Sequence, residues 1–185
     1  TRYPLPLASS STGVDYPPDM VEAARRQFPD TKLEVCDARD LSAYGSGQFD
    51  FVLFSFNGLD CLSDEGRRRA LAEIHRVLKP GGIAYIEVPD IQWCVAQFLG
   101  APEPNGYTNP EYDYNTQHKW GLWAQAIWGD QHHDGLFHKW GYTAHRLLNL
   151  LNHVGFHPIE IQFVQSHGVQ CLSAKAAKAS GSVSA

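Results

Sequence analysis

The chain has 185 residues, 43% of them hydrophobic, which is enough for one well-filled domain and too few for us to expect two. A formal net charge of -5 gives no large positive field for a phosphate backbone, so we expect no nucleic-acid partner. No run of about 18 apolar residues is present, so we expect no membrane partner. The four cysteines form no CxxC pair, which favours a reduced, cytoplasmic compartment.

The chain begins with a predicted strand and helix. Residues 12–15 (TGVD) have the pattern of a short strand that ends in an acid. Residues 18–28 have helical periodicity, and Pro18 suits the first helical position. Four residues form the predicted apolar face of this helix: Met20, Ala23, Ala24 and Phe28.

Two more strands and the clearest helix follow. Residues 32–37 (KLEVCD) alternate as a strand, and the run FDFVLFSF at 49–56 indicates a strand buried on both faces. Residues 63–78 repeat apolar side chains at helical spacing, and 83–88 (IAYIEV) form another strand. This alternation predicts an open α/β sheet covered by helices.

The second half is less regular. We expect helices at 91–100 and 116–129, with loops around them that make 100–141 a substrate-side insertion. Thr143 is placed to cap a helix that Gly155 ends, and an antiparallel hairpin closes the sheet. The sequence thus predicts one domain over 1–175 and a flexible, small and polar tail over 176–185.

Four motifs in register carry a family resemblance. They are GVDYPPDMVEAAR at 13–25, VCDARDL at 35–41, FDFVLFSFNGLDCL at 49–62 and EIHRVLKPGGIAYIEV at 73–88. In this order they resemble the class I S-adenosylmethionine-dependent methyltransferases. The resemblance implies a Rossmann-like, mostly parallel sheet with helices on both faces and an antiparallel C-terminal hairpin. It also implies methyl transfer with S-adenosyl-L-methionine as cofactor.

The resemblance assigns six cofactor-binding positions: Asp15, Tyr16, Asp37, Ala38, Phe54 and Ser55. An acid at a strand's carboxyl end can accept hydrogen bonds from both ribose hydroxyls, which is the role implied for Asp15. Tyr16 would pack against the ribose or adenine, and Asp37 would accept from the adenine amino group. The alternatives are a turn-forming or helix-capping role for Asp15 and a loop Asp37 that bonds its own backbone.

The resemblance also places candidate catalytic residues near the acceptor. Asn57 and Asp60 would orient the acceptor or take its proton, although Asn57 also suits a turn and Asp60 a helix cap. His132 and His138 lie in a histidine-rich loop, where an ordinary pKa of about 6.5 suits a general base. Their spacing does not favour a metal site, so we expect no metal. The many tryptophans favour an aromatic or sugar-like small molecule as the acceptor.

The start of the chain departs from the family pattern. The family's first strand and its Gly-rich turn are missing, because residues 1–11 (TRYPLPLASSS) contain no glycine and two prolines. The resemblance places that strand between 12–15 and 49–56, so its loss leaves two inner strand edges unpaired or forces a new pairing. An upstream segment, residues 2–9 or another chain would have to supply it.

This departure keeps a second function open. A chain without the Gly-rich turn fits a catalytically degenerate protein that keeps the methyltransferase fold as a structural or interaction subunit. For either function, a homodimer or a larger assembly is an open expectation. A hydride-transferring dehydrogenase is disfavoured, because no GxGxxG motif is visible.

Overall fold

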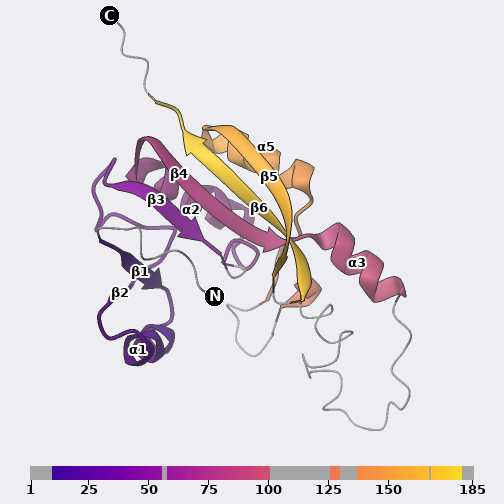
Figure 1. Cartoon of the computed structure of the whole chain (residues 1–185), viewed down its shortest axis with the longest axis horizontal. Coiled ribbons are helices and arrows are strands. Elements are labelled where there is room, and N and C mark those ends of the chain that lie inside the picture. Colours follow the sequence, from indigo (N-terminus) through magenta and orange to yellow (C-terminus); the bar gives the residue numbers. More distant parts are fainter. Residues whose placement is uncertain (1–9, 56–57, 101–125, 130–136, 167, 181–185) are drawn as a thin grey trace, which may run out of the picture.

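The computed structural model describes residues 10–55, 58–100, 126–129, 137–166 and 168–180 (Figure 1). Within them the chain forms β1 (Thr12–Asp15), α1 (Pro18–Gln27), β2 (Lys32–Val35), β3 (Phe49–Phe54), α2 (Asp64–Val77), β4 (Leu78–Pro89), α3 (Ile91–Gly100), α5 (Ala144–Val154), β5 (Phe156–Ser166) and β6 (Val169–Lys178). The expected alternation of strands and helices is confirmed.

The strands form two sheets. β1 and β2 are parallel, with Asp15 opposite Val35 at the carboxyl end of the pair. The larger sheet has the order β3-β4-β6-β5, in which β3 and β4 are parallel and β6 is antiparallel to both of its neighbours. Three of its strands therefore run in one direction and only β6 opposes them, which confirms the predicted antiparallel hairpin.

The two sheets are separated at the place where the resemblance puts a further strand. β1 pairs only with β2, and β3 only with β4, in the part of the chain that the structure describes. The β1–β2 pair is seen at the β3 end of the larger sheet in Figure 1. The expected open edges at β1 and β3 are therefore present among these residues.

Helices cover both faces of the larger sheet, but unevenly. α2 and α5 cover one face, and their buried Leu71, Ile74, Leu147 and Leu151 pack in one core with sheet residues that include Ile86, Leu172 and Ala174. α3 lies against β6, where Cys94 packs with Val169. Val169 and Leu172 are three positions apart in β6, and side chains an odd number of positions apart in a strand point to opposite faces of the sheet. α3 therefore packs on the face opposite to the one that α2 and α5 cover.

Two burial expectations were wrong. Phe51 in β3 was expected to be buried but is 55% exposed, while Val52 and Phe54 of the same strand pack against the core that contains α2. Met20 in α1 and Phe28 just after its end are 55% and 52% exposed, and Val21 is the buried residue of that helix. The predicted apolar face of α1 differs from the buried one because this helix packs only on the small β1–β2 pair among the elements with several contacts to it.

The ends of the elements follow the local signals. The Thr143 hydroxyl accepts the Arg146 N–H at 3.2 Å, and Gly155 ends α5 with a left-handed φ of 105°. β6 continues to Lys178, whose Nζ donates to the Leu78 carbonyl at 2.8 Å. Residues 176–178 of the expected flexible tail therefore belong to the sheet. None of the helices described here is long and apolar enough to cross a membrane.

Candidate cofactor and acceptor site

Asp15 and Asp37 lie at the same edge of the small sheet. Asp15 is the last residue of β1, and Asp37 follows β2 by two positions. The Cys36 N–H donates to the Asp15 carbonyl at 2.9 Å, which links the two strand ends. The Asp15 carboxylate accepts the Tyr16 N–H at 2.8 Å and is otherwise exposed, as is the Tyr16 ring. Both side chains are therefore accessible to a ligand at this edge.

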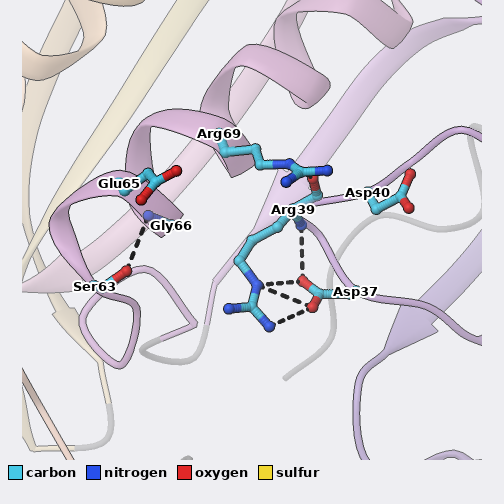
Figure 2. Close-up of a pocket in the computed structure, with 7 residues that line it drawn as sticks. All are labelled: Asp37, Arg39, Asp40, Ser63, Glu65, Gly66 and Arg69. Atoms are coloured by element: carbon cyan, nitrogen blue, oxygen red, sulfur yellow. Dashed lines mark hydrogen bonds and ion pairs between the residues drawn. The ribbon is translucent and has the colours of Figure 1, made fainter.

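Arg39 holds the Asp37 carboxylate (Figure 2). The Arg39 N–H donates to Asp37 Oδ1 at 2.8 Å, and Arg39 Nε lies 3.0 Å from Oδ1 and 2.9 Å from Oδ2. These hydrogen bonds from Arg39 keep the pKa of Asp37 below its ordinary value, against the opposing effect of burial. The alternative stated for Asp37, a loop aspartate that bonds nearby backbone, is thus present as the bond from the Arg39 N–H. The bonds from Arg39 also keep the Asp37 carboxylate ionised, so that it can act as an acceptor.

A cavity of about 340 Å³ lies beside Asp37, between the loop after β2 and the first turn of α2 (Figure 2). Its lining residues are Asp37, Arg39, Asp40, Ser63, Glu65, Gly66 and Arg69. Arg69 Nε donates to the Arg39 carbonyl at 2.8 Å and so fastens this loop to α2. Of the six predicted cofactor positions, only Asp37 lines this polar cavity.

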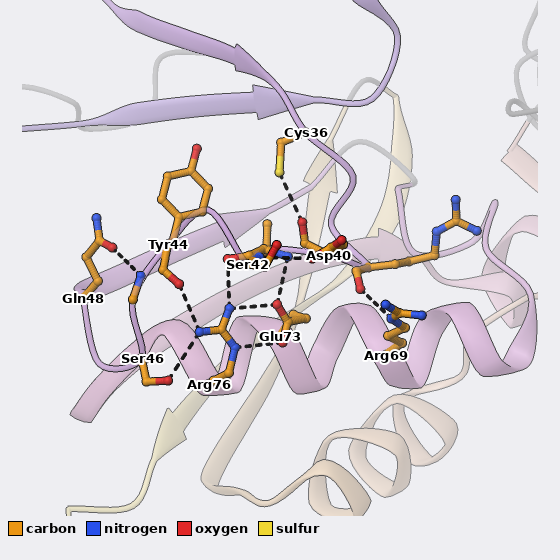
Figure 3. Close-up of polar contacts among 12 residues, drawn as sticks. Cys36, Asp40, Ser42, Tyr44, Ser46, Gln48, Arg69, Glu73 and Arg76 are labelled. Carbon is orange, nitrogen blue, oxygen red and sulfur yellow. Dashed lines mark hydrogen bonds and ion pairs between the residues drawn. The ribbon is translucent and has the colours of Figure 1, made fainter.

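A second anchor, which sequence reasoning missed, holds the next part of the same loop (Figure 3). The Leu41 N–H donates to Glu73 Oε2 at 2.8 Å, and Arg76 donates to the Leu41 and Tyr44 carbonyls at 2.8 and 3.0 Å. The spacing of Glu73 and Arg76 on a helix can be recognised in the sequence. Their contacts with the backbone of Leu41 and Tyr44 cannot, because these residues lie far away along the chain. The anchor fixes the loop that follows Asp37.

The remaining predicted cofactor positions lie on the loop after β2 and at the end of β3. Ala38, Phe54 and Ser55 are all half-buried. A Cβ atom added at Gly58 would lie 2.8 Å from the Phe54 ring, so only glycine lets the chain turn this closely after β3. The structure thus places Phe54 and Ser55 beside the turn that leads to Asp60.

Asp60 is buried at the end of this turn. It is 2% exposed, and its Oδ1 has no hydrogen-bond partner among the described residues. Burial raises the pKa of Asp60 well above its ordinary value, although the nearby Arg67 charge acts in the opposite direction. Ser63 caps α2 through its bond from the Gly66 N–H, so Asp60 is not the helix cap. Asn57 lies outside the described residues.

Residues 137–142 pack over Asp60. The Lys139 N–H donates to the Asp60 carbonyl at 2.9 Å, and the Trp140 ring lies over the buried Arg67 guanidinium at 4.6 Å. Tyr142 is 1% exposed, and its hydroxyl has no hydrogen-bond partner within the described part of the chain. Sequence reasoning missed Tyr142, because a tyrosine after a glycine in a loop carries no signal of burial.

His138 lies next to this cluster. Its Nδ1 is 3.0 Å from the Ala126 carbonyl, and its N–H donates to the Trp128 carbonyl at 3.1 Å. Burial lowers the pKa of His138, so the ring is neutral near pH 7. His132 falls outside the described residues. Where the structure describes the chain, no three His, Cys, Asp or Glu residues are grouped so as to hold a metal ion.

Known proteins resemble this chain in part of its sequence. A family model described as a methyltransferase domain matches residues 3–82. A ubiquinone/menaquinone biosynthesis C-methyltransferase from Geobacter sp. (strain M21) is 35% identical over 83 residues, which are 42% of this chain and 34% of that protein. The chain thus spans about a third of the length of this relative.

Solved structures share the fold at low sequence identity. A Methanosarcina mazei S-adenosylmethionine-dependent methyltransferase has a TM-score of 0.62 at 18% identity, with 92% of this chain and 82% of that one covered. The CurJ carbon methyltransferase has a TM-score of 0.64 at 15% identity, with 95% and 44% covered. A Burkholderia thailandensis 1,6-didemethyltoxoflavin-N1-methyltransferase, solved with S-adenosylhomocysteine, has a TM-score of 0.55 at 22% identity, with 91% and 60% covered. The chain therefore has the fold of the class I S-adenosylmethionine-dependent methyltransferases, and its resemblance to that family, carried by residues 3–82, is confirmed.

Proposed function

We propose that this chain transfers a methyl group from S-adenosylmethionine to a small molecule, for which an aromatic or sugar-like compound is the expected class. The observation that carries the proposal is the pairing of two acids at one sheet edge. Asp15 and Asp37 end neighbouring parallel strands, and the Cys36 N–H to Asp15 carbonyl bond joins them. The methyltransferase domain match includes both residues.

The cofactor roles follow from the chemistry of these side chains. Asp15 accepts hydrogen bonds from the two ribose hydroxyls, and the exposed Tyr16 ring packs against the ribose or adenine. Asp37 stays ionised beside Arg39 and accepts from the adenine amino group, while the Ala38 backbone faces the ring. Phe54 and Ser55 pass beside the methionine part. S-adenosylmethionine supplies the methyl group as an electrophile on a sulfonium.

The acceptor roles are divided between two parts of the chain. His138 acts as general base, because a bond from Nδ1–H to the Ala126 carbonyl leaves the Nε2 lone pair free. Asp60 orients the acceptor as a neutral hydrogen-bond donor, since burial disfavours its charged form. Asn57 and His132 are proposed to assist in the same region. Positioning of this kind can supply much of the rate of a methyl transfer.

The test is transfer of an isotopically labelled methyl group to a panel of phenols, enols and sugars. The chain is expected to label a member of the panel, and Asp15→Ala is expected to abolish labelling. Asp50→Ala is the matched control, because Asp50 is an exposed acid paired with Lys79. No transfer together with no binding of S-adenosylmethionine would instead support the degenerate, subunit-like alternative.

A further inference from the structure

Two buried oxygen atoms lack a hydrogen-bond partner in the regions that the structure describes: Asp60 Oδ1 and the Tyr142 hydroxyl. Their residues are only 2% and 1% exposed. Buried polar groups are nearly always paired, and leaving one unpaired costs stability. Unpaired groups that are kept despite this cost are characteristic of sites that bind a ligand.

Both residues are held at the carboxyl ends of the larger sheet. Asp60 lies in the turn after β3, and Tyr142 forms a bridge with Asp90, the residue that follows β4. The Lys139 N–H bonds the Asp60 carbonyl and the Ile91 N–H bonds the Tyr142 carbonyl, each at 2.9 Å. Their backbones are therefore fixed, so the missing side-chain bonds are not a sign of a loose segment.

The chain on either side of Asp60 is partly exposed. Ser55, Gly58 and Cys61 flank Asp60 along the chain, and all three are half-buried. This is the same turn in which Phe54 and Ser55 are proposed to approach the methionine part of the cofactor. An acceptor held at Asp60 would consequently lie close to the methyl group that it receives.

The surroundings keep both groups neutral. Arg67, the cation near Asp60, uses Nη1 on the Leu62 carbonyl at 2.8 Å and Nη2 on Asp64 at 3.1 Å. Asp60 therefore has no direct cationic partner among the described residues, and burial raises its pKa. Burial likewise raises the pKa of Tyr142. At neutral pH each residue presents an O–H donor and no negative charge.

We propose that Asp60 and Tyr142 together bind the oxygen of an enolate or phenolate acceptor. The inference rests on the proposed function and narrows its acceptor to enols, 1,3-dicarbonyl compounds and phenols. A tyrosine and a neutral carboxylic acid in an apolar site can stabilise an oxyanion in this way. A neutral sugar hydroxyl gains less from the pair, because it carries no developing negative charge.

The pair also favours transfer to carbon. Hydrogen bonds to the oxygen hold its lone pairs, so the α-carbon of an enolate, or a ring carbon ortho or para to the oxygen of a phenolate, attacks instead. A carbon–carbon bond forms to the methyl group as the methyl–sulfur bond breaks and its electron pair stays on sulfur. The acceptor's negative charge and the sulfonium's positive charge cancel, and the proton lost when the acceptor ionises passes to His138 and from there to solvent.

The test is binding of p-nitrophenolate to the full chain without S-adenosylmethionine, followed through the absorbance of the probe. The native chain is expected to bind it, and Tyr142→Phe and Asp60→Leu, which each remove one donor, are expected to weaken binding about tenfold or more, as for a hydrogen bond to a charged group. Tyr85→Phe and Asp50→Leu are the matched controls and should bind as the native chain does. Tyr85 alternates in β4 with the core residues Ala84 and Ile86, and Asp50 belongs to an exposed ion pair.

Stability separates this role from a structural one. Tyr142→Phe removes an unpaired hydroxyl and should leave the urea midpoint unchanged or raised, while binding falls. A native chain that does not bind the probe would overturn the proposal, as would folded Tyr142→Phe and Asp60→Leu variants that bind it normally. Because the cofactor is absent from this assay, a failure here is distinct from a failure to bind S-adenosylmethionine.

Discussion

Arg76 contacts Glu73 through two parallel hydrogen bonds on α2, with Nε 2.8 Å from Oε1 and Nη2 2.8 Å from Oε2. The same two side chains bond the backbone of Leu41 and Tyr44 (Figure 3). The geometry is bidentate, and both side chains are at least two-thirds buried. This pair therefore fastens the loop after β2, which contains Asp37, to the core helix α2.

Removing this anchor should destabilise the chain. Glu73→Ala leaves Arg76 and the Leu41 N–H without their acceptor, so we expect the free energy of unfolding in urea to fall by about 1–3 kcal/mol. Glu22→Ala is the control, because Glu22 and Arg25 form an exposed pair at the same spacing in α1. That change should cost less than about 1 kcal/mol. Equal losses in the two variants would contradict the anchoring role.

The loss of stability at low pH should depend on the carboxylates of Glu73 and Asp37. Hydrogen bonds from Arg76 lower the pKa of Glu73, and those from Arg39 lower the pKa of Asp37. A lowered folded-state pKa gives stability that is present above the unfolded-state pKa and is lost as the pH falls through the folded-state pKa. Urea midpoints of the native chain should fall below about pH 4, and Glu73→Ala should show a shallower fall. Identical slopes would exclude Glu73 as a contributor.

His138 should titrate below the ordinary histidine range. Burial lowers its pKa, and the Ala126 carbonyl fixes a proton on Nδ1. An NMR titration of the ring, assigned by the loss of signals in His138→Gln, should give a pKa below about 6.5 and the Nδ1–H tautomer at pH 7. A pKa above this value, or a proton on Nε2 at pH 7, would remove His138 as the general base.

The β1–β2 pair should be the less stable of the two sheets. A two-stranded sheet is marginal by itself, and the edge of β1 that faces away from β2 has no strand partner among the described residues. Amide hydrogen exchange should be faster in β1 than in the central β4 and β6, with β1 protection rising when S-adenosylhomocysteine is added. Uniform protection of both sheets would contradict this picture.

Local signals in the sequence predicted most elements, because caps, turns and periodicity act over a few residues. Thr143, Gly155 and the apolar stripe of α2 are examples. The exposure of Phe51 was not predicted, because burial of a strand face depends on which helices lie over it. The Arg76 contacts to Leu41 and Tyr44 join positions more than 30 apart, so no local pattern indicates them.

The site was predicted to a similar extent. Asp15 and Asp37 were predicted because a strand followed by an acid is a local pattern with a family counterpart, and the structure places both at one sheet edge, while their cofactor role stays a prediction. The Arg39 contact that holds Asp37 was not predicted, since an arginine in a loop has many accessible conformations. Tyr142 was missed for another reason: its burial beside Asp60 depends on how residues 137–142 fold back over α2 and β3.

Calorimetric titration of the chain with S-adenosylhomocysteine tests the central claim most directly. We predict saturable binding by the native chain, a loss of about tenfold or more in Asp15→Ala from the two ribose contacts, and native affinity in Asp50→Ala. No heat of binding at millimolar ligand, or equal affinity in Asp15→Ala and the native chain, would contradict the proposed cofactor site.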